Sequence, residues 1–223
     1  MDFERARHNM IEQQIRPWNV LDQDVLDLLY AVRREDFVPP AYRQLAFTDV
    51  EIPLVVDGEQ TGETMLEPKV EARILQSLGL RKHESVLEIG TGSGYMAALL
   101  AHRARRVRSV EIQPSLARFA QSNLSAAGVQ NCEVETRNGA EFIEPGEERF
   151  DVIVVSGGLR FVPDGLLDRL GPEGRCAVIV GQDPVMWAQI VRRLGPSRFA
   201  TEALFETVAP PMIGFPQREG FRF

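Results

Sequence analysis

Cysteine and histidine are scarce in this 223-residue chain. The two cysteines are Cys132 and Cys176, and the three histidines, His8, His83 and His102, lie far apart. Neither residue type has the close spacing of metal ligands, so the sequence predicts no metal site. Both cysteines fall in segments that we expect to be buried strands, where they serve as small apolar side chains.

Long apolar runs are missing as well, because no uninterrupted stretch approaches the ~20 residues that cross a bilayer. The first residues, Met1–Arg5, lack the basic segment followed by an apolar stretch that is typical of a secretory leader. We therefore expect a cytoplasmic protein with no membrane partner.

Positive charge is in deficit, with 25 Lys and Arg against 32 Asp and Glu and a formal net charge of −7. This balance argues against nucleic-acid binding as the main function, since neutralising phosphates requires clustered Lys and Arg. The chain is 44% hydrophobic and 26% charged, which is typical of a globular protein with a large core. We expect one domain with an appendage.

The most informative stretch is a short apolar run, Val86–Ile89, followed by three alternate glycines, Gly90, Gly92 and Gly94, and then by Tyr95–Leu100. This order predicts a strand, a tight turn and a helix. Glycine allows positive φ and brings the backbone close to a ligand, and the start of the helix offers unpaired N–H groups. Such a turn also occurs as a plain connection, so the neighbouring acids decide the interpretation.

Two acids at strand ends favour a cationic ligand. Glu88 would repel the pyrophosphate of a dinucleotide, but it would attract the sulfonium and ammonium groups of S-adenosylmethionine. About twenty residues after the first glycine, the predicted strand Val107–Glu111 also ends in an acid, in the position where a carboxylate accepts hydrogen bonds from ribose hydroxyls. The pair Glu88 and Glu111 therefore favours S-adenosylmethionine over NAD.

The segments before this turn predict a helical cap. Apolar residues at helical spacing predict helices over residues 2–15 and 22–32, and a third helix runs from about residue 70 to Gly79. Between them, residues 49–68 combine Pro, Gly and several acids, a composition that suits a loop.

The remaining segments alternate between strands and helices, which predicts a doubly wound sheet. After the glycine turn we expect a helix over residues 114–128, strands over 132–136, 150–155 and 175–180, and a short helix over 162–170. Ser156-Gly157-Gly158 should end the strand before it, and Gly171–Gly174 should form a turn. Residues 187–194 and 201–208 predict an antiparallel pair at one edge, with a helical alternative left open, and residues 209–223 predict irregular structure.

The fold class is therefore α/β, a doubly wound Rossmann-like sheet that is mostly parallel with an antiparallel edge strand, plus an N-terminal helical cap. We predict a single domain over residues 1–223, with the cap and a substrate loop in residues 1–80 and the cofactor-binding core in residues 81–223.

Four stretches together resemble the protein-L-isoaspartate O-methyltransferase family. They are residues 10–15 (MIEQQI), 34–39 (REDFVP), 87–95 (LEIGTGSGY) and 150–154 (FDVIV). The glycine turn is shared by many methyltransferases, but its combination with the N-terminal stretches is more specific. The resemblance implies a Rossmann-like methyltransferase, S-adenosylmethionine as methyl donor and the free carboxylate of isoaspartyl residues in damaged proteins as acceptor.

The resemblance also implies cofactor contacts. Glu88 and the three glycines would line the methionine part and Glu111 would hold the ribose. The implied cofactor-binding residues are Met65, Glu88, Gly90, Thr91, Gly92, Gly94, Glu111, Ile112, Asn138 and Gly139. Asn138-Gly139 stands where the family usually has Asp-Gly facing the adenine, and Asn both donates and accepts hydrogen bonds.

The substrate loop departs from the family pattern. Thr64-Met65-Leu66-Glu67-Pro68 aligns with a family segment of the pattern Thr-Ile-Ser-Gln-Pro, so Leu66 replaces a serine whose hydroxyl is thought to position the acceptor carboxylate. Leucine donates no hydrogen bond, and Glu67 in place of Gln adds a negative charge. We take Thr64, Leu66 and Glu67 as candidate acceptor-site residues, without assigning a catalytic one.

Methyl transfer to a carboxylate needs no general base, because a group with a pKa near 4 is already ionised at neutral pH. The lack of an obvious histidine base fits this acceptor, and it also fits a protein that binds the cofactor without catalysis. A diverged methyltransferase acting on another carboxylate, a small molecule or RNA is the other alternative.

Overall fold

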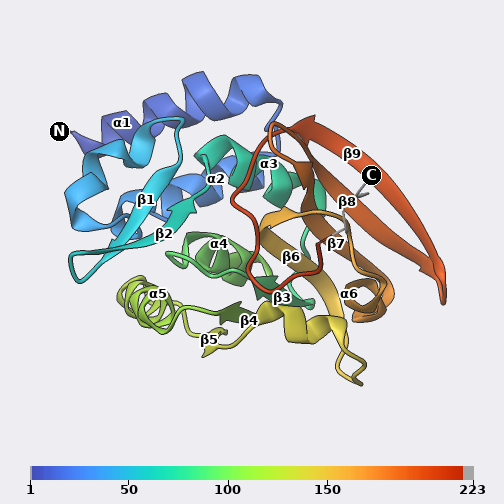
Figure 1. The fold of residues 1–223 in the computed structure, drawn as a ribbon. Helices are drawn as coiled ribbons and strands as arrows, with labels where there is room; N and C mark the ends of the chain where they lie inside the picture. The colour runs from blue at the N-terminus through green and yellow to red at the C-terminus, as the bar shows by residue number, and fades with distance from the viewer. Residues whose placement is uncertain (1, 218–223) are drawn as a thin grey trace.

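A seven-stranded sheet forms the centre of the computed structural model, which describes residues 2–217 (Figure 1). The strand order is β5-β4-β3-β6-β7-β8-β9. The strands are β3 (Ser85–Ile89), β4 (Arg106–Glu111), β5 (Cys132–Thr136), β6 (Phe150–Leu159), β7 (Leu170–Gln182), β8 (Val185–Gly195) and β9 (Arg198–Glu206). In this order, the strands from β5 through β4, β3 and β6 to β7 are parallel. Strands β8 and β9 then pair antiparallel at one edge. The predicted fold class and edge pair are confirmed.

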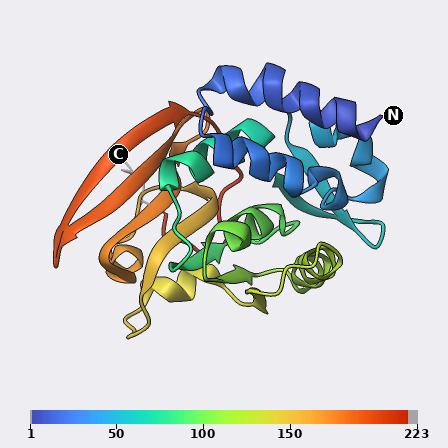
Figure 2. The ribbon, with the colours of Figure 1, turned by 180° about the vertical axis from the view of Figure 1, so that it is seen from behind.

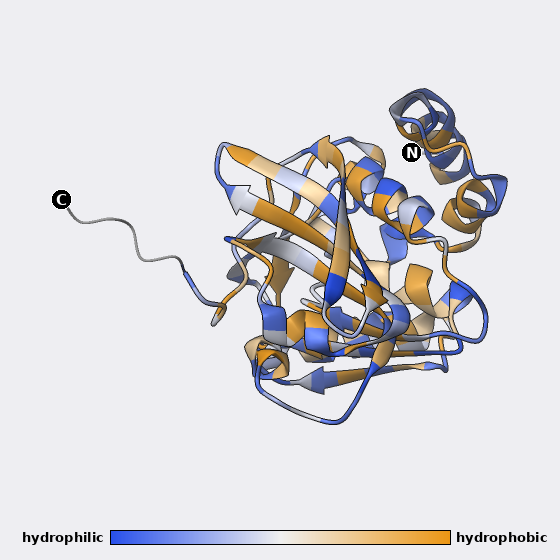
Figure 3. Ribbon diagram, turned by 90° about the vertical axis from the view of Figure 1, so that its right-hand side faces the viewer, coloured by the Kyte–Doolittle hydropathy of each residue, from blue (hydrophilic) through white to orange (hydrophobic). Residues whose placement is uncertain are grey.

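Both faces of the sheet are covered, so its central strands are mostly apolar, with Glu88 of β3 as a buried exception (Figure 3). Along β3 and β6, neighbouring residues alternate between two core clusters, with Val86 and Val152 in one and Leu87 and Ile153 in the other. The first cluster lies under α3 (Pro68–Leu78), α4 (Tyr95–Arg103) and α5 (Pro114–Ala126). The second lies under η5 (Gly139–Ile143) and α6 (Asp164–Asp168).

The N-terminal cap packs beside α3 on the first face (Figure 2). It consists of α1 (Phe3–Met10), which continues as a π-helical turn η1 (Ile11–Ile15), followed by η2 (Arg16–Trp18), α2 (Gln23–Ala31), η3 (Arg34–Asp36) and η4 (Pro40–Phe47). The side chain of Asp2 caps α1 by accepting from Arg5 N at 3.1 Å, and Asp22 caps α2 in the same way. The predicted cap helices are confirmed within one or two residues.

The loop expected over residues 49–68 is wrong, because the segment forms a hairpin of β1 (Ile52–Val56) and β2 (Glu59–Met65). Asp57 and Gly58 form its two-residue turn with φ of 54° and 83°, the conformation that Asp-Gly favours between antiparallel strands. Ile52 and Leu54 point inward and are buried, while Pro53 between them is exposed.

The expected end of β6 at Ser156-Gly157-Gly158 is also wrong, because the strand continues to Leu159. Its last two residues, Gly158 and Leu159, pair with β7. The C-terminal segment adds two hydrogen bonds: Gly158 N donates to Pro210 O at 2.7 Å, and Met212 N donates to Gly158 O at 2.9 Å. Similarly, the predicted helix over 162–170 shortens to α6, and the turn at 171–174 lies within β7, because Leu170 already pairs with Phe150.

The C-terminal segment 209–217 is irregular as predicted, apart from its bridge to Gly158. It runs between the cap and β6 toward β3 (Figure 1). Residues 218–223, the rest of the segment predicted to be irregular, lie outside the described residues.

A buried ion pair ties the start of the sheet to α3. Arg175 on β7 donates from Nη1 and Nη2 to the two carboxylate oxygens of Glu84, at 2.7 and 2.9 Å. It also donates to the carbonyls of Leu78 and Gly79, at the end of α3. The arginine and the glutamate are 7% and 5% exposed, so neither charge has water as a substitute partner.

Replacing Arg175 by Ala leaves the Glu84 carboxylate buried without a counter-charge. Because breaking a buried pair costs about 3–5 kcal/mol, we expect a loss of this size in the free energy of unfolding, measured by urea titration. Arg192→Ala is the matched control, since Arg192 lies on neighbouring β8 and is 4.0 Å from Glu202 at the surface. Equal losses in the two variants would show that the buried pair does not stabilise the fold.

Candidate active site

A cavity opens at the carboxyl ends of β3, β4 and β6. Its floor is the glycine turn after β3, one wall is the end of the β1–β2 hairpin with the first turn of α3, and the opposite wall is the C-terminal segment Pro210–Ile213. Ligands of doubly wound sheets bind in such a crevice, at the carboxyl ends of the strands.

The glycine turn lets the backbone form this floor. Gly90 and Gly92 have φ of 91° and 53°, a region that other residues rarely adopt. A Cβ at Gly90 would lie 3.1 Å from Met212 Cε, and one at Gly92 would lie 3.3 Å from Leu54 Cδ1. Any larger residue would therefore fill the space between the turn and both walls.

Glu88 lies beneath the turn with no exposed surface. Its Oε2 accepts from Ser109 Oγ at 2.6 Å and its Oε1 accepts from Ser156 Oγ at 3.1 Å. Burial raises the pKa of Glu88 to about 8, although the two serine hydrogen bonds oppose the shift. Among residues 2–217 no basic side chain neutralises Glu88, so a bound cation would stabilise its ionised form.

Glu111, at the end of β4, is oriented by two backbone donors. Gly92 N donates to its Oε2 and Gln113 N to its Oε1, both at 3.0 Å. Each carboxylate oxygen can accept a second hydrogen bond, so Glu111 can still bind hydroxyl groups in the cavity.

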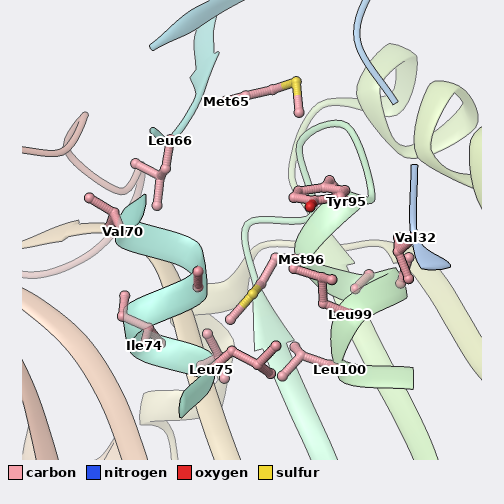
Figure 4. Packing of buried hydrophobic residues seen from close by; sticks show 14 of the residues in the cluster. Val32, Met65, Leu66, Val70, Ile74, Leu75, Tyr95, Met96, Leu99 and Leu100 are labelled. Carbon is pink, nitrogen blue, oxygen red and sulfur yellow. The ribbon is translucent and has the colours of Figure 1, made fainter. Parts of the chain in front are cut away.

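The hairpin delivers the predicted loop residues to different places. Thr64, Met65 and Leu66 line the cavity, and Figure 4 shows Leu66 at the start of α3, across from Met96 and Tyr95 of α4. Thr64 Oγ1 donates to Glu51 Oε2 at 3.2 Å. Glu67, in contrast, precedes α3 outside the cavity wall, where burial raises its pKa.

Most of the predicted cofactor residues come together here. Those that line the cavity are Met65, Glu88, Gly90, Thr91, Gly92, Glu111 and Ile112. Gly94, Asn138 and Gly139 do not: Gly94 starts α4, and Asn138 caps η5 by accepting from Ala140 N at 3.0 Å. Gly139 is buried against Ile89. Their roles remain predictions.

Two parts of the wall were missed by sequence reasoning. Glu71 precedes Ile74, Leu75 and Leu78 by three, four and seven residues, so it lies on the apolar face of helix α3. An acid on that face is a sequence signal for a buried carboxyl group. The segment Pro210–Ile213 carries no such local signal, because its place depends on pairing with Gly158.

The cavity is acidic. Its walls hold the carboxyl groups of Glu63, Glu71, Glu88 and Glu111, and among the described residues no Lys, Arg or His lines it. Burial and the charge of Glu111 raise the pKa of Glu63. Over residues 2–217 no group of His, Cys, Asp or Glu is arranged to hold a metal ion, and no helix there is long and apolar enough to cross a membrane. The site therefore suits an organic cation.

Comparison with known proteins agrees with this geometry. The family model described as protein-L-isoaspartate(D-aspartate) O-methyltransferase matches residues 5–209. A protein-L-isoaspartate O-methyltransferase of Methanoculleus marisnigri is 39% identical over 214 residues, covering 94% of this chain and 92% of that protein. One of Syntrophotalea carbinolica is 36% identical and covers 96% of each chain.

Among solved structures, a Plasmodium falciparum chain has a TM-score of 0.76 and 18% identity, covering 95% of this chain and 98% of its own. It is named a protein-L-isoaspartate O-methyltransferase and is in complex with S-adenosyl-L-homocysteine. At this identity the likeness shows the shared fold.

The raised pKa of Glu88 makes the stability of the ligand-free protein depend on pH. The folded state keeps a proton that the unfolded chain loses above its ordinary pKa of 4.5, so stability falls as the pH rises from 5 to 8. Glu88→Gln keeps the neutral form at every pH. At pH 5 we expect the variant and the parent protein to have equal melting temperatures. At pH 8 the variant should melt at least ~2–4 °C higher, which is the change in melting temperature that ~1 kcal/mol of unfolding free energy produces in a domain of this size. A difference that is the same at both pH values would contradict this origin.

Proposed function

Because the chain belongs to the protein-L-isoaspartate(D-aspartate) O-methyltransferase family, we propose that it transfers a methyl group from S-adenosyl-L-methionine to the carboxylate of isoaspartyl residues in damaged proteins. The family match over residues 5–209 carries the proposal, since it includes the cap, the hairpin and the glycine turn, which is all of the crevice except the wall at Pro210–Ile213. The protein partner is then any damaged chain that exposes such a residue.

The cavity fits this cofactor in charge and shape. The cofactor supplies an activated methyl group on a positively charged sulfur. Glu88 would face its cationic methionine end across the turn at Gly90 and Gly92, where the backbone leaves room for a close approach. Glu111 would accept hydrogen bonds from the ribose hydroxyls, since two backbone N–H groups hold it in place.

The chain's contribution to the reaction is alignment. In the transfer, an acceptor oxygen forms a bond to the methyl carbon while the carbon–sulfur bond breaks and its electron pair remains on sulfur. Met65, Leu66 and Met212 line this space, and their apolar side chains would keep water from the bound reactants. Orientation of two reactants supplies roughly 7–11 kcal/mol in favourable cases, and an ionised carboxylate needs no base.

One observation favours a second candidate, a methyltransferase whose acceptor is not a carboxylate. Leu66 removes the family's serine hydroxyl, and the described cavity walls carry acids but no basic side chain. A neutral or cationic acceptor would meet less repulsion there.

The proposed function is tested by transfer of labelled methyl from S-adenosyl-L-methionine to an isoaspartyl peptide, with the same peptide containing ordinary aspartate as control. We expect labelling of the isoaspartyl peptide alone, after calorimetry has shown cofactor binding. Binding without labelling would overturn the acceptor assignment, and a panel of small-molecule and RNA acceptors would then separate another methyltransferase from a non-catalytic binder.

The ribose assignment is tested by Glu111→Ala. We expect S-adenosyl-L-homocysteine to bind at least ~10-fold more weakly, because hydrogen bonds to a charged group contribute about 1.5–3 kcal/mol. Glu135→Ala is the matched control, since it removes an acid from neighbouring β5 that pairs with Arg108 outside the cavity. Equal dissociation constants for Glu111→Ala and the parent protein would remove the assignment.

A further inference from the structure

Glu71 is a buried acid that the reaction described above does not use. It lies in the first turn of α3, lines the cavity and is only 5% exposed. Its Oε2 has no hydrogen-bond partner among the described residues. An unsatisfied buried carboxyl oxygen is costly, so its place beside the cavity requires an explanation.

Arg34 is the nearest cation and forms a buried ion pair with Glu71, but it donates no hydrogen bond to that carboxyl group. Its Nη1 donates to Ala46 O at 3.2 Å and its Nη2 donates to Leu66 O at 2.6 Å. The remaining Nε lies 3.6 Å from Glu71 Oε2, too far for a hydrogen bond. Arg34 is also 1% exposed and does not line the cavity, so it cannot reach a bound acceptor.

The surroundings of Glu71 favour its neutral form. Burial raises its pKa to about 7. The groups that face it are Arg34 from η3, which opposes the shift, Glu67 before its own helix, Glu88 from β3 and the Tyr95 hydroxyl from α4. Burial also raises the pKa of Tyr95, so this hydroxyl is neutral. Arg34 is thus the one cation in this set, and the two other acids favour a proton on Glu71.

A carboxylate acceptor needs a hydrogen-bond donor that most of the wall does not supply. Thr64 Oγ1 donates to Glu51, Ser156 Oγ donates to Glu88, and Thr91 Oγ1 shares a hydrogen bond with Ser109. Leu66, in the place of the family's serine, has nothing to donate. Two cavity-lining side chains remain, the Ser93 hydroxyl, which accepts from Tyr95 N in the glycine turn, and Glu71, which stands in the same wall as Leu66.

We propose that Glu71, in its protonated form, donates its O–H to the acceptor carboxylate and so replaces the hydroxyl that Leu66 lacks. The inference rests on the proposed function and makes Glu71 a determinant of acceptor specificity. The proton stays on Glu71 while the second acceptor oxygen attacks the methyl group. Two carboxyl groups that share one proton form a stable pair, whereas two ionised groups would repel each other.

The protonation state of Glu71 determines how the rate of methylation depends on pH. The acceptor, with a pKa near 4, is ionised across the neutral range. Glu71 loses its proton as the pH rises through about 7, and the bound site then holds two facing anions. The kcat/KM for an isoaspartyl peptide should therefore be highest below pH 7 and fall toward tenfold per pH unit above it.

The test is the pH profile of kcat/KM from pH 5.5 to 9, in Glu71→Gln and the parent protein. Released methanol is counted together with the methyl ester, because such esters hydrolyse in alkali. The Gln amide donates at every pH, so we expect the variant to keep activity and lose the alkaline decline. Glu202→Gln, which removes an exposed acid of β9, is the control and should keep the parent profile.

A second pair of variants tests the exchange of donors. Glu71→Leu removes the donor, so kcat/KM should fall at least ~10-fold below pH 7, where the parent protein keeps its proton, and should show no alkaline decline. Adding Leu66→Ser to it restores a hydroxyl in the same wall, and we expect this double variant to recover activity without the alkaline decline. Melting temperature and S-adenosyl-L-homocysteine binding show whether each variant is folded with an intact cofactor site.

The outcomes separate the two proposals. A rate that rises with pH, together with an inactive Glu71→Gln, would make Glu71 a base for an N–H or O–H acceptor and overturn the donor role. Identical profiles in Glu71→Gln and the parent protein would overturn it as well, with isoaspartyl methylation intact. Absence of isoaspartyl methylation at every pH, with the cofactor bound, would remove the proposed function and this inference together.

Discussion

The burial of carboxyl groups at the end of the parallel sheet is the constraint on which the site depends. Glu88 is held below the glycine turn by two serine hydroxyls, and no cation faces it in the part of the chain that the structure describes, so its negative charge is costly in the free protein. A cationic ligand above the turn relieves that cost. The buried charge of Glu88, which destabilises the empty site, therefore favours the charged methyl donor. The backbone at Gly90 and Gly92 forms the floor of the site, where it leaves room for that donor.

The N-terminal cap completes the site by fixing the hairpin to α3. Arg34 from η3 bonds the carbonyls of Ala46 and Leu66 and lies against Glu71, so one buried side chain joins the cap, the hairpin and the helix. Arg34 also packs over the Tyr95 ring, with Cζ 5.5 Å from its centroid. This arrangement holds Leu66 and Glu71 in one wall, facing the glycine turn.

The opposite wall comes from the far end of the chain. After β9, the segment from Ala209 onward returns across β6, pairs with Gly158 and places Met212 against Gly90 and Gly157. The cavity thus lies between two segments about 150 residues apart in sequence, the hairpin and this return segment. The hairpin extends from the cap and the return segment comes from β9, while the glycine turn after β3 forms the floor between them (Figure 1).

Local patterns were sufficient for much of the fold. The apolar strands, the glycine turn, the cap helices and the antiparallel edge pair were all predicted, because each depends on residues that are neighbours in sequence. The Asp57-Gly58 turn was also visible in the sequence, but it was outweighed by the acids and glycines around it. The length of β6 was not predictable, since its last residues are paired by β7 and by the C-terminal segment, which follow later in the chain.

The sequence by itself determined the α/β class, the family and the two strand-end acids, Glu88 and Glu111, because strand periodicity and the spacing of acids after glycines are local properties. Only the tertiary structure decided what surrounds them. It placed Glu71 in the cavity wall, directed the hydroxyls of Thr64 and Ser156 to other acids, and left Asn138 and Glu67 outside. Burial and hydrogen-bond partners are set by segments that meet only in the folded chain, and these decide which carboxyl groups are charged and which can donate.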